Sequence, residues 1–291
     1  MKTAKIILKL AEALDLELPE DRRRTGPKKY RLKSLALAIL FRHLLRLSSD
    51  RDLVRKLQNF SELRKACKLK KVPSVSTISR ARNRISLSGI FYQLVAKAKE
   101  IGLARGFILS VDSTQFEAYL RGDKEAKLGY CAAKDDWIFG YKAHIVTDAE
   151  SELPVAVVVT PANEADSNQF FPLMKRVWKN FTHEVRKLLA DSGYDAGYIR
   201  KWLREHGILD IIDRNKRRGN DFGKPKDPDY KKRSASERVN SHAKDGFALG
   251  RFTFAGLQRA LQHVYACLSA MLFSAIGCSL LGMKDWRRLV I

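Results

Sequence analysis

Hydrophobic and polar positions change their period near residue 100, and this change divides the chain into two kinds of structure. Before it, apolar residues recur at helical spacing, as in the apolar-rich stretch Leu32–Leu47. Ser49 and Asp50 follow this stretch and can cap a further helix, because their side chains accept hydrogen bonds from the first N–H groups of a helix. The pattern therefore predicts an all-helical domain over residues 1–100.

Beyond residue 100 the chain consists of short β-branched or apolar runs, which are typical of strands. Three such runs come first, and helical patterns at Asn168–Lys179 and Gly197–His206 separate the later ones. This order predicts an α/β domain over residues 101–291, with a ribonuclease H-like mixed sheet flanked by helices. The predicted strands are Phe107–Ser113, Tyr141–Thr147, Val155–Thr160, Lys187–Asp191 and Leu209–Asp213.

Three further segments have their own interpretation. Val264–Met283 has no charged residue and is long enough to cross a bilayer, but its Ser, Gly, Ala and Cys residues favour a buried helix packed against the sheet. Arg214–Tyr230 is expected to be a polar loop. Met1–Glu12 is a short Lys-bearing amphipathic stretch and does not have the pattern of a secretory signal. No membrane partner is expected.

The charge balance indicates the class of partner. The chain has 55 Lys and Arg against 32 Asp and Glu, a formal charge of +23. This excess makes a polyanion the default partner, with an inert basic surface or acidic lipid as alternatives. The basic residues lie in separate segments, which suit a long DNA track better than one membrane patch. These segments are Arg22–Lys33, Arg64–Lys71, Arg80–Arg84 and Arg214–Arg233.

A short helix is predicted at Val75–Ile85, directly after Pro73 and Ser74. It ends in alternate arginines and follows earlier helices, which resembles the recognition element of a helix-turn-helix. A helical bundle with a basic rim explains the pattern equally well. On the first interpretation the arginines contact DNA, and they are Arg80, Arg82 and Arg84.

Cysteine and histidine spacing argues against a zinc hydrolase. The four cysteines form no CxxC pair, and the six histidines form neither an HxxxH nor an HExxH pattern. The thiols are expected to stay reduced in a cytoplasmic protein. They are Cys67, Cys131, Cys267 and Cys278.

Phosphate-seeking and reactive side chains recur at helical offsets in the last third of the chain. At about 100° per residue, Tyr230, Arg233, Glu237 and Lys244 fall in one stripe about 60° wide on an amphipathic helix. A lone carboxylate among a phenol, an arginine and a lysine suits a metal ion beside a nucleic-acid backbone. An ordinary solvated helix face is the alternative. The apolar residues of the opposite face are Ala235, Val239 and Ala243.

This pattern resembles the signature of DDE transposases of bacterial and archaeal insertion sequences, in which Glu237 corresponds to the final acidic residue. The resemblance extends from about Ile101 to the C-terminus. Asp112 lies in a run similar to the strand of the first aspartate, and Asp191 in one similar to the strand end of the second. Gly140–His144 and Thr160–Ser167 are similar to the blocks between them.

The resemblance implies a transposase that binds terminal inverted repeats, cleaves DNA and transfers the strands. Two hard divalent cations about 3.5–4 Å apart, Mg²⁺ with Mn²⁺ as a substitute, would support the chemistry. Asp112 would bridge both ions, and Asp191 and Glu237 would complete one side each. The residues that would contact phosphates or bases are Tyr230, Arg233 and Lys244.

Each acid also has a structural alternative. Asp112 could cap a turn with the hydroxyl residues that follow it, and Asp191 could belong to Asp-Ser-Gly turn chemistry. Asp166 and Asp195 are the nearest competing acids, and both are expected in loops or caps. His144 could line the site or be satisfied by a neighbour.

The implied partners are double-stranded DNA, as transposon ends and as target, and further copies of the chain in a homodimer or higher oligomer. A prokaryotic, nucleoid-associated location follows. The alternatives are a catalytically silent DNA-binding protein derived from a transposase and a structure-selective nuclease on the same fold. Glu237 follows Asp191 by only 46 positions. That is too short for the β-rich insertion domain of some relatives, so the DNA contacts and hairpin-stabilising role of such an insertion are not carried over.

Overall fold

The computed structural model describes residues 29–131, 135–215 and 225–283, which group into two compact units. The helical unit contains residues up to Lys97, together with Ala243–Thr253 and the chain from Gln262 onward. The sheet unit contains Ala98–His242 and Phe254–Leu261. Residues 243–253 and 262–283 thus group with the N-terminal helices, although the sequence assigns them to the second domain. The functional division into 1–100 and 101–291 stays a prediction.

Some predicted segments lie wholly or partly outside the described residues. These are Met1–Glu12, residues 22–28 of the first basic segment, and residues 216–224 of the loop Arg214–Tyr230.

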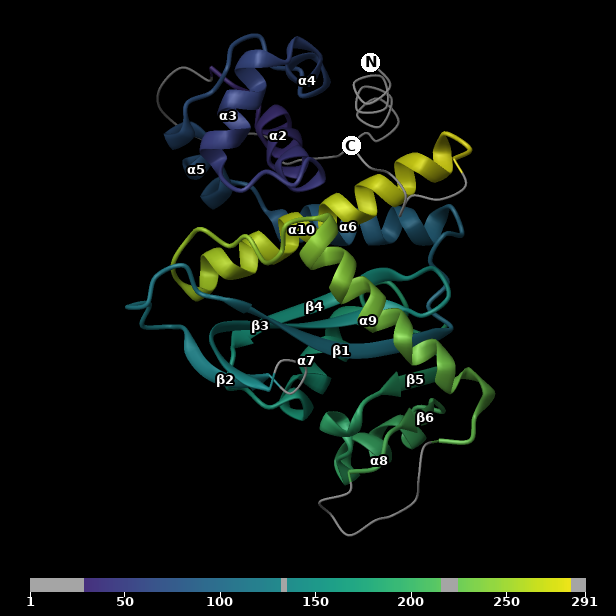
Figure 1. The fold of residues 1–291 in the computed structure, drawn as a ribbon. Helices are drawn as coiled ribbons and strands as arrows, with labels where there is room; N and C mark the ends of the chain where they lie inside the picture. The colour runs from purple at the N-terminus through teal and green to yellow at the C-terminus, as the bar shows by residue number, and fades with distance from the viewer. Residues whose placement is uncertain (1–28, 132–134, 216–224, 284–291) are drawn as a thin grey trace. The chain divides into compact units, whose positions relative to one another are not determined.

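Helix capping explains where two helices of the helical unit begin. Ser49 accepts a hydrogen bond from the Asp52 N–H at 3.1 Å, which confirms the predicted cap. Ser74 accepts one from the Thr77 N–H at 3.3 Å at the start of the predicted basic helix. The helices of this unit are α2 (Leu32–Leu44), α3 (Asp50–Asn59), α4 (Ser61–Ala66), α5 (Val75–Arg84), α6 (Leu87–Glu100) and, from Gln262, α10 (Leu257–Leu280) (Figure 1).

Helix α10 contains the uncharged segment. It is long and apolar enough to cross a membrane by length and composition, but 89% of its most apolar window is buried inside the protein. Phe273 packs edge-on against Phe41 of α2 with ring centroids 5.8 Å apart, and Tyr265 lies 5.6 Å from Phe91 of α6. The predicted burial is confirmed, but helices supply these contacts where the sequence predicted a sheet.

Two buried histidines hold the segment Ala243–Thr253 onto this unit. The rings of His43 and His263 are 5.0 Å apart. His43 Nδ1 donates to the Phe247 carbonyl at 2.9 Å, and His263 Nε2 donates to the Leu249 carbonyl at 2.9 Å. Burial lowers the pKa of His43 well below its usual value and that of His263 to about 3. Both rings are therefore neutral in the folded protein.

The sheet unit is a mixed sheet. Strand β3 pairs antiparallel with β1 and β4, while β5 and then β6 continue in parallel on the other side of β1. This is the ribonuclease H-like arrangement, so the predicted fold class is confirmed. The strands are β1 (Ile108–Glu117), β2 (Lys127–Cys131), β3 (Asp136–Asp148), β4 (Leu153–Pro161), β5 (Lys187–Ala190) and β6 (Leu209–Ile212).

Strand β2 has no counterpart among the predicted strands. Its sequence contains a glycine and no β-branched residue, so it carries little strand signal. It exists because it pairs with the first part of β3, from Lys127 opposite Gly140 to Cys131 opposite Asp136. The partner strand, and not local propensity, creates it.

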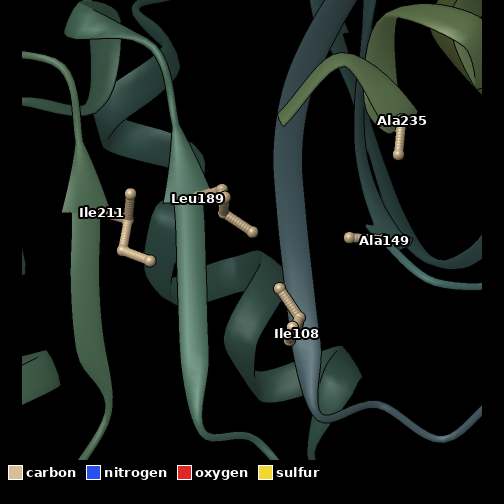
Figure 2. Close-up of a cluster of buried hydrophobic side chains, with 5 residues drawn as sticks. All are labelled: Ile108, Ala149, Leu189, Ile211 and Ala235. Carbon is tan, nitrogen blue, oxygen red and sulfur yellow. The ribbon is translucent and has the colours of Figure 1, made fainter. Parts of the chain in front are cut away.

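Helices pack against the antiparallel and the parallel strands of the sheet. α9 (Ser234–Ser241) packs on β1 and β3, while α7 (Phe170–Val177) packs on β3 and β4 and follows the short 3₁₀ helix η1 (Asp166–Gln169). α8 (Gly197–Glu205) follows β5 through a second 3₁₀ turn, η2 (Ser192–Tyr194). Figure 2 shows a buried cluster that joins three neighbouring strands to α9, made by Ile108, Ala149, Leu189, Ile211 and Ala235.

The predicted helix Tyr230–Lys244 is three different helices in succession. A 3₁₀ helix, η4, spans Pro228–Arg233, α9 follows, and a π-helical turn spans His242–Gly246. Because 3₁₀ and π turns advance by a different angle per residue than an α-helix, the single stripe predicted from a constant angle does not describe the whole segment.

Acid should weaken the helical unit through His43 and His263. Their folded pKa values lie below the unfolded value of about 6.5, so the unfolded chain binds more protons and stability falls as the pH drops below that value. Each histidine should cost up to about 1.4 kcal/mol per pH unit. Urea denaturation between pH 7.5 and 5 measures this slope. His263→Asn, which keeps a donor but does not titrate, should flatten it, whereas the exposed His183→Gln should leave it unchanged. An equal slope in His263→Asn would contradict the assignment.

Candidate active site

Three neighbouring parallel strands of the sheet unit bring an aspartate to the same level of the sheet. Val111, the last residue of β1 that pairs with β5, is aligned with Ala190, and Ala190 is aligned with Ile212 of β6. The residues that follow these three therefore form a row, in the middle of β1 and directly after β5 and β6. They are Asp112, Asp191 and Asp213.

Asp112 is the acid of this row whose negative charge is least favoured by its surroundings. One carboxylate oxygen accepts a hydrogen bond from the Ser113 N–H at 2.8 Å, and the other accepts one from Asn240 Nδ2 of α9 at 2.8 Å. Burial nevertheless raises the pKa of Asp112 to about 7, and the negative charges of Asp191 and Asp166 add to the rise. The site therefore concentrates more negative charge than its hydrogen bonds compensate.

The pKa of Asp191 is raised as well. Burial and the charge of Asp166 raise its pKa, although the Gly193 N–H donates to its Oδ1 at 3.0 Å. The backbone passes so close here that a β-carbon at Gly193 would lie 3.0 Å from Asp191 and 3.3 Å from Asp166. Glycine at this position therefore leaves room for the carboxylates of both Asp191 and Asp166 beside the turn η2.

Asp166, expected in a loop or cap, belongs to this acidic group. It starts η1, and its Oδ1 lies 3.2 Å from Lys142 Nζ and 3.3 Å from His144 Nδ1, both on β3. Burial by itself would raise the pKa of Asp166. Hydrogen bonds from His144 and Ser113 and the charge of Lys142 outweigh burial, so the pKa of Asp166 is lowered. Asp166 is therefore a compensated anion beside two uncompensated ones. Asp195, the other competing acid, is tied to Arg200 at 2.8 Å.

Helix α9 is pinned over Asp112 by side-chain contacts. Ser110 Oγ of β1 donates to Ser236 Oγ at 2.9 Å, and Asn240 reaches Asp112 one helical turn later. Glu237 lies on this helix, but its carboxylate pairs with Arg233 at 2.9 Å and the side chain is 51% exposed. The predicted third acid is thus near the row and engaged with an arginine.

Tyr230 is anchored in the sheet unit. Its ring packs against the cluster of Figure 2, and its hydroxyl donates to Asp213 Oδ2 at 3.1 Å. Its expected role at a phosphate or a base stays a prediction. Arg233 lies over the same ring, 6.0 Å from its centroid.

Lys244 falls in a different unit from the other three members of the stripe. It lies on the π-helical turn, and Ala243–Thr253 belongs to the helical unit. Its role at the phosphate stays a prediction.

The three arginines of α5 have unlike surroundings. Arg80 and Arg84 are exposed, whereas Arg82 is 3% exposed and donates to both oxygens of Asp50, at 2.6 and 3.3 Å. Arg42 also approaches this carboxylate, at 3.6 Å. Arg82 joins α5 to α3 inside the unit, so its assignment as a DNA contact is corrected. At about 100° per residue, Arg82 lies about 200° from Arg80 and from Arg84, on the opposite side of the helix. The side that faces α3 therefore carries Arg82, and the exposed side carries the other two.

The donor set suits a hard cation in part. Carboxylate oxygens are the ligands that Mg²⁺ prefers, and a cation would relieve the repulsion between Asp112 and Asp191. Tyr194 adds a fully buried hydroxyl with no hydrogen-bond partner among the described residues, close to the same carboxylates. However, no three His, Cys, Asp or Glu side chains in the described ranges converge as a ready metal group. Asp112 and Asp191 fit the ion, whereas Glu237 is held by Arg233.

Sequence reasoning overlooked two residues of this site. Asn240 lies three positions after Glu237, so the offset rule that selected the stripe could have included it. Asp213 ends a predicted strand just as Asp191 does, and the shared strand-end position was its signal.

Comparison with known proteins gives a family for most of the chain. Residues 106–273 match the family described as transposase DDE domain, and residues 4–84 match a second transposase domain family (DUF772). A curated relative, the putative transposase for insertion sequence element IS402 of Burkholderia cepacia, is 36% identical over 92 residues. That alignment covers 29% of this chain and 43% of the relative, so less than half of the relative's length is matched.

Two solved structures are similar over most of the chain. A piggyBac transposase synaptic complex with hairpin DNA matches with a TM-score of 0.44 and 9% identity, covering 99% of this chain and 76% of that one. A Mos1 transposase paired-end complex with the left transposon end matches with a TM-score of 0.25 and 9% identity, covering 80% and 82%. Similarity at this level adds nothing to the topology described above.

Substitutions in α5 should separate structure from binding. Arg82→Ala should destabilise the protein by about 3–5 kcal/mol, because it leaves Asp50 buried without its closest partner. Arg80→Ala and Arg84→Ala should change stability by less than about 0.5 kcal/mol. Urea denaturation measures each difference. Equal stability of Arg82→Ala and wild type would refute the buried role of Arg82.

Proposed function

Because this chain belongs to the transposase DDE domain family, we propose that it is the transposase of an insertion sequence, which cuts DNA at the element ends and joins them to a target. The observation that carries this proposal is that Asp112 inside β1 lies level with Asp191 directly after β5, with α9 hydrogen-bonded to Asp112. The name of the IS402 relative supports the same activity.

Asp112 and Asp191 would hold the catalytic divalent ions, Mg²⁺ or Mn²⁺, with two ions in each site and Glu237 as the third ligand. Bound cations of this kind stabilise the charge that develops on an attacked phosphate and lower the pKa of the attacking water or hydroxyl. The raised pKa values of Asp112 and Asp191 support this role, because two crowded carboxylates retain full charge only beside a positive partner.

Arg233 and Glu237 act as a pair that must open for both to work. In the closed pair, 2.9 Å apart, Glu237 neutralises the guanidinium and is itself withheld from the aspartates. A DNA phosphate that takes the guanidinium in a bidentate contact would free Glu237 toward Asp112. Substrate binding and completion of the acidic triad would then be one event.

The neighbouring polar residues position the reacting groups. Asn240 donates to Asp112 and fixes the orientation of its carboxylate, while Lys142 and His144 hold Asp166 beside Asp191. Tyr230 donates a hydrogen bond to Asp213 at the end of the row, and its ring lies against the guanidinium of Arg233. Tyr230, Arg233 and Glu237 would supply the first three residues of the predicted signature, and Lys244 would complete it by holding a phosphate as a point charge.

Double-stranded DNA is the proposed partner, both as element ends and as target. The net charge of +23 supports binding to a polyanion, and exposed Arg80 and Arg84 at the end of α5 suit groove or backbone contacts. A homodimer or higher oligomer would bring two ends together. Residues 243–253 and 262–283 pack with the N-terminal helices, so point variants test end recognition more cleanly than removal of residues 1–100.

One observation favours the silent DNA-binding alternative. The three acids do not converge in the described conformation, because Glu237 pairs with Arg233. Cation-dependent nicking decides between the two functions.

Removal of either central aspartate should abolish cleavage. Asp112→Asn and Asp191→Asn keep the shape of the side chain but lose the charge that would hold the cation, so nicking of element-end DNA should fall by at least about a hundredfold. The assay is supercoiled-plasmid nicking with Mg²⁺, Mn²⁺ or Ca²⁺, and Ca²⁺ should support binding without cleavage. Asp136→Asn, an exposed acid at the start of β3, is the control. Near-normal nicking by Asp112→Asn would reject the assignment.

Opening of the ion pair predicts unlike failures for its two members. Arg233→Ala should weaken strand transfer and raise the DNA concentration needed for nicking, while Glu237→Gln should raise the Mg²⁺ concentration needed and leave DNA affinity unchanged. Arg238→Ala is the matched control, because this arginine lies on α9 beside Glu237 and pairs with Glu152 at 2.8 Å. If Arg233→Ala matches Arg238→Ala in both titrations, the pair has no part in the reaction.

A further inference from the structure

The helices α7 and α8, together with the residues that cap their C-terminal ends, carry a continuous row of rings, here called the aromatic ridge. Trp202 is its centre, with ring centroids 6.0 Å from Phe171, 5.0 Å from Trp178 and 3.9 Å from His206. Tyr198 extends the row, 5.9 Å from Phe171. The ridge comprises Phe171, Trp178, Tyr198, Trp202 and His206, all in the sheet unit (helices α7 and α8 in Figure 1).

The ridge is additional to the core of these helices. α7 buries Phe170 and Leu173, and α8 buries Ile199 and Leu203, all at 1% exposure or less. Phe171 and Tyr198, by contrast, are 42% and 48% exposed although each has a buried neighbour in sequence. Large rings left in water next to a satisfied core indicate a binding surface.

The ridge begins beside the acidic group. Asp166 starts the 3₁₀ turn that leads directly into α7, and Asp191 caps the turn that leads to α8. Phe171 and Tyr198 lie in the first turns of these two helices. The row then runs toward the helix ends at Trp178 and His206, away from the carboxylates. A strand that leaves the acidic group can therefore pass directly onto the rings.

The border of the ridge is basic. Lys175 and Lys179 on the α7 side and Lys201 and Arg204 on the α8 side are exposed. α7 contains no acidic residue, and Glu205 of α8 lies 3.9 Å from Lys201. Rings flanked by cations are the combination that binds single-stranded nucleic acid, because bases stack on the rings and phosphates meet the cations.

We propose that the aromatic ridge binds the unpaired bases of a DNA strand next to the cleavage site. The inference rests on the proposed function, since it assigns the strand to DNA cut at Asp112 and Asp191. Bases in a duplex are already stacked on one another, so exposed rings discriminate in favour of unpaired ones. A second copy of this chain is a poorer occupant, because a symmetric contact would bring the lysines of one ridge against those of the other.

Strand binding by the full-length protein tests the proposal. The variant Phe171→Ala/Tyr198→Ala removes two exposed rings of the ridge. Phe107→Ala/Tyr119→Ala removes one phenylalanine and one tyrosine of similar exposure, 43% and 62%, elsewhere in the sheet unit. Phe171→Tyr/Tyr198→Phe keeps both rings. Fluorescence anisotropy with a labelled thymidine oligonucleotide and with a duplex of equal length, in EDTA, gives both affinities.

The ridge variant should bind the single strand about tenfold or more weakly, with duplex affinity changed less than about threefold. The distant double variant and the ring-keeping variant should bind both DNAs like wild type. Wild-type strand affinity in the ridge variant, or equal losses for strand and duplex, would overturn the proposal. So would a change from oligomer to monomer in sedimentation with strand affinity retained, which would make the ridge a contact between copies.

The test separates this inference from the proposed function. Nicking and duplex binding of the distant double variant report on the function alone. If both are present and the ridge variant keeps its strand affinity, only the ridge assignment fails. If the distant variant neither nicks nor binds duplex, the proposed function fails as well.

Discussion

The gathering of like charges at one level of three parallel strands is the constraint on which the sheet unit depends. The register of β1, β5 and β6 brings Asp112, inside β1, level with Asp191 and Asp213, which directly follow β5 and β6. Each carboxylate loses water and gains a negative neighbour. Burial, with the charges of Asp191 and Asp166 added to it, raises the pKa of Asp112 to about 7.

Much of the surrounding structure compensates this charge with directed hydrogen bonds. Asn240 donates a hydrogen bond to Asp112, and Tyr230 donates one to Asp213. The backbone N–H of Gly193 donates one to Asp191. None of these partners carries a positive charge, so they orient the carboxylates without neutralising them. Lys142, placed at Asp166, compensates only the member of the group that starts a helix. An uncompensated pair at the sheet edge is what a site for a divalent cation requires.

The segment that covers the row changes its helical type twice, and its chemistry follows from those changes. The 3₁₀ helix brings Tyr230 against the core, the α-helical part places Glu237 and Asn240 one turn apart, and the π turn passes the chain to the other unit. In that unit the neutral rings of His43 and His263 hold the returning chain by its backbone carbonyls. The two units are thus interleaved along the sequence, although each has its own core.

Local pattern was sufficient for the elements and the main acids of this protein. Short β-branched or apolar runs located five strands, Ser49 and Ser74 marked helix starts, and the resemblance to insertion-sequence transposases selected Asp112, Asp191 and Glu237. Local pattern failed where contact with a distant strand or helix decides whether an element forms or which way a side chain points. β2 exists through β3, and Arg82 turns inward to Asp50.

The sequence by itself determined which residues carry charge, which stretches alternate, and hence the α/β class and the identity of the candidate acids. Only the tertiary structure decided which groups meet. Register placed Asp213 and Asp191 in one row, the contacts with Lys142 and His144 of β3 positioned Asp166, and the pairing of Arg233 with Glu237 withheld the third acid. The reason is physical: side-chain identity fixes what a group can bind, whereas distance and burial, which set its charge state and its partner, arise from contacts between residues far apart in sequence.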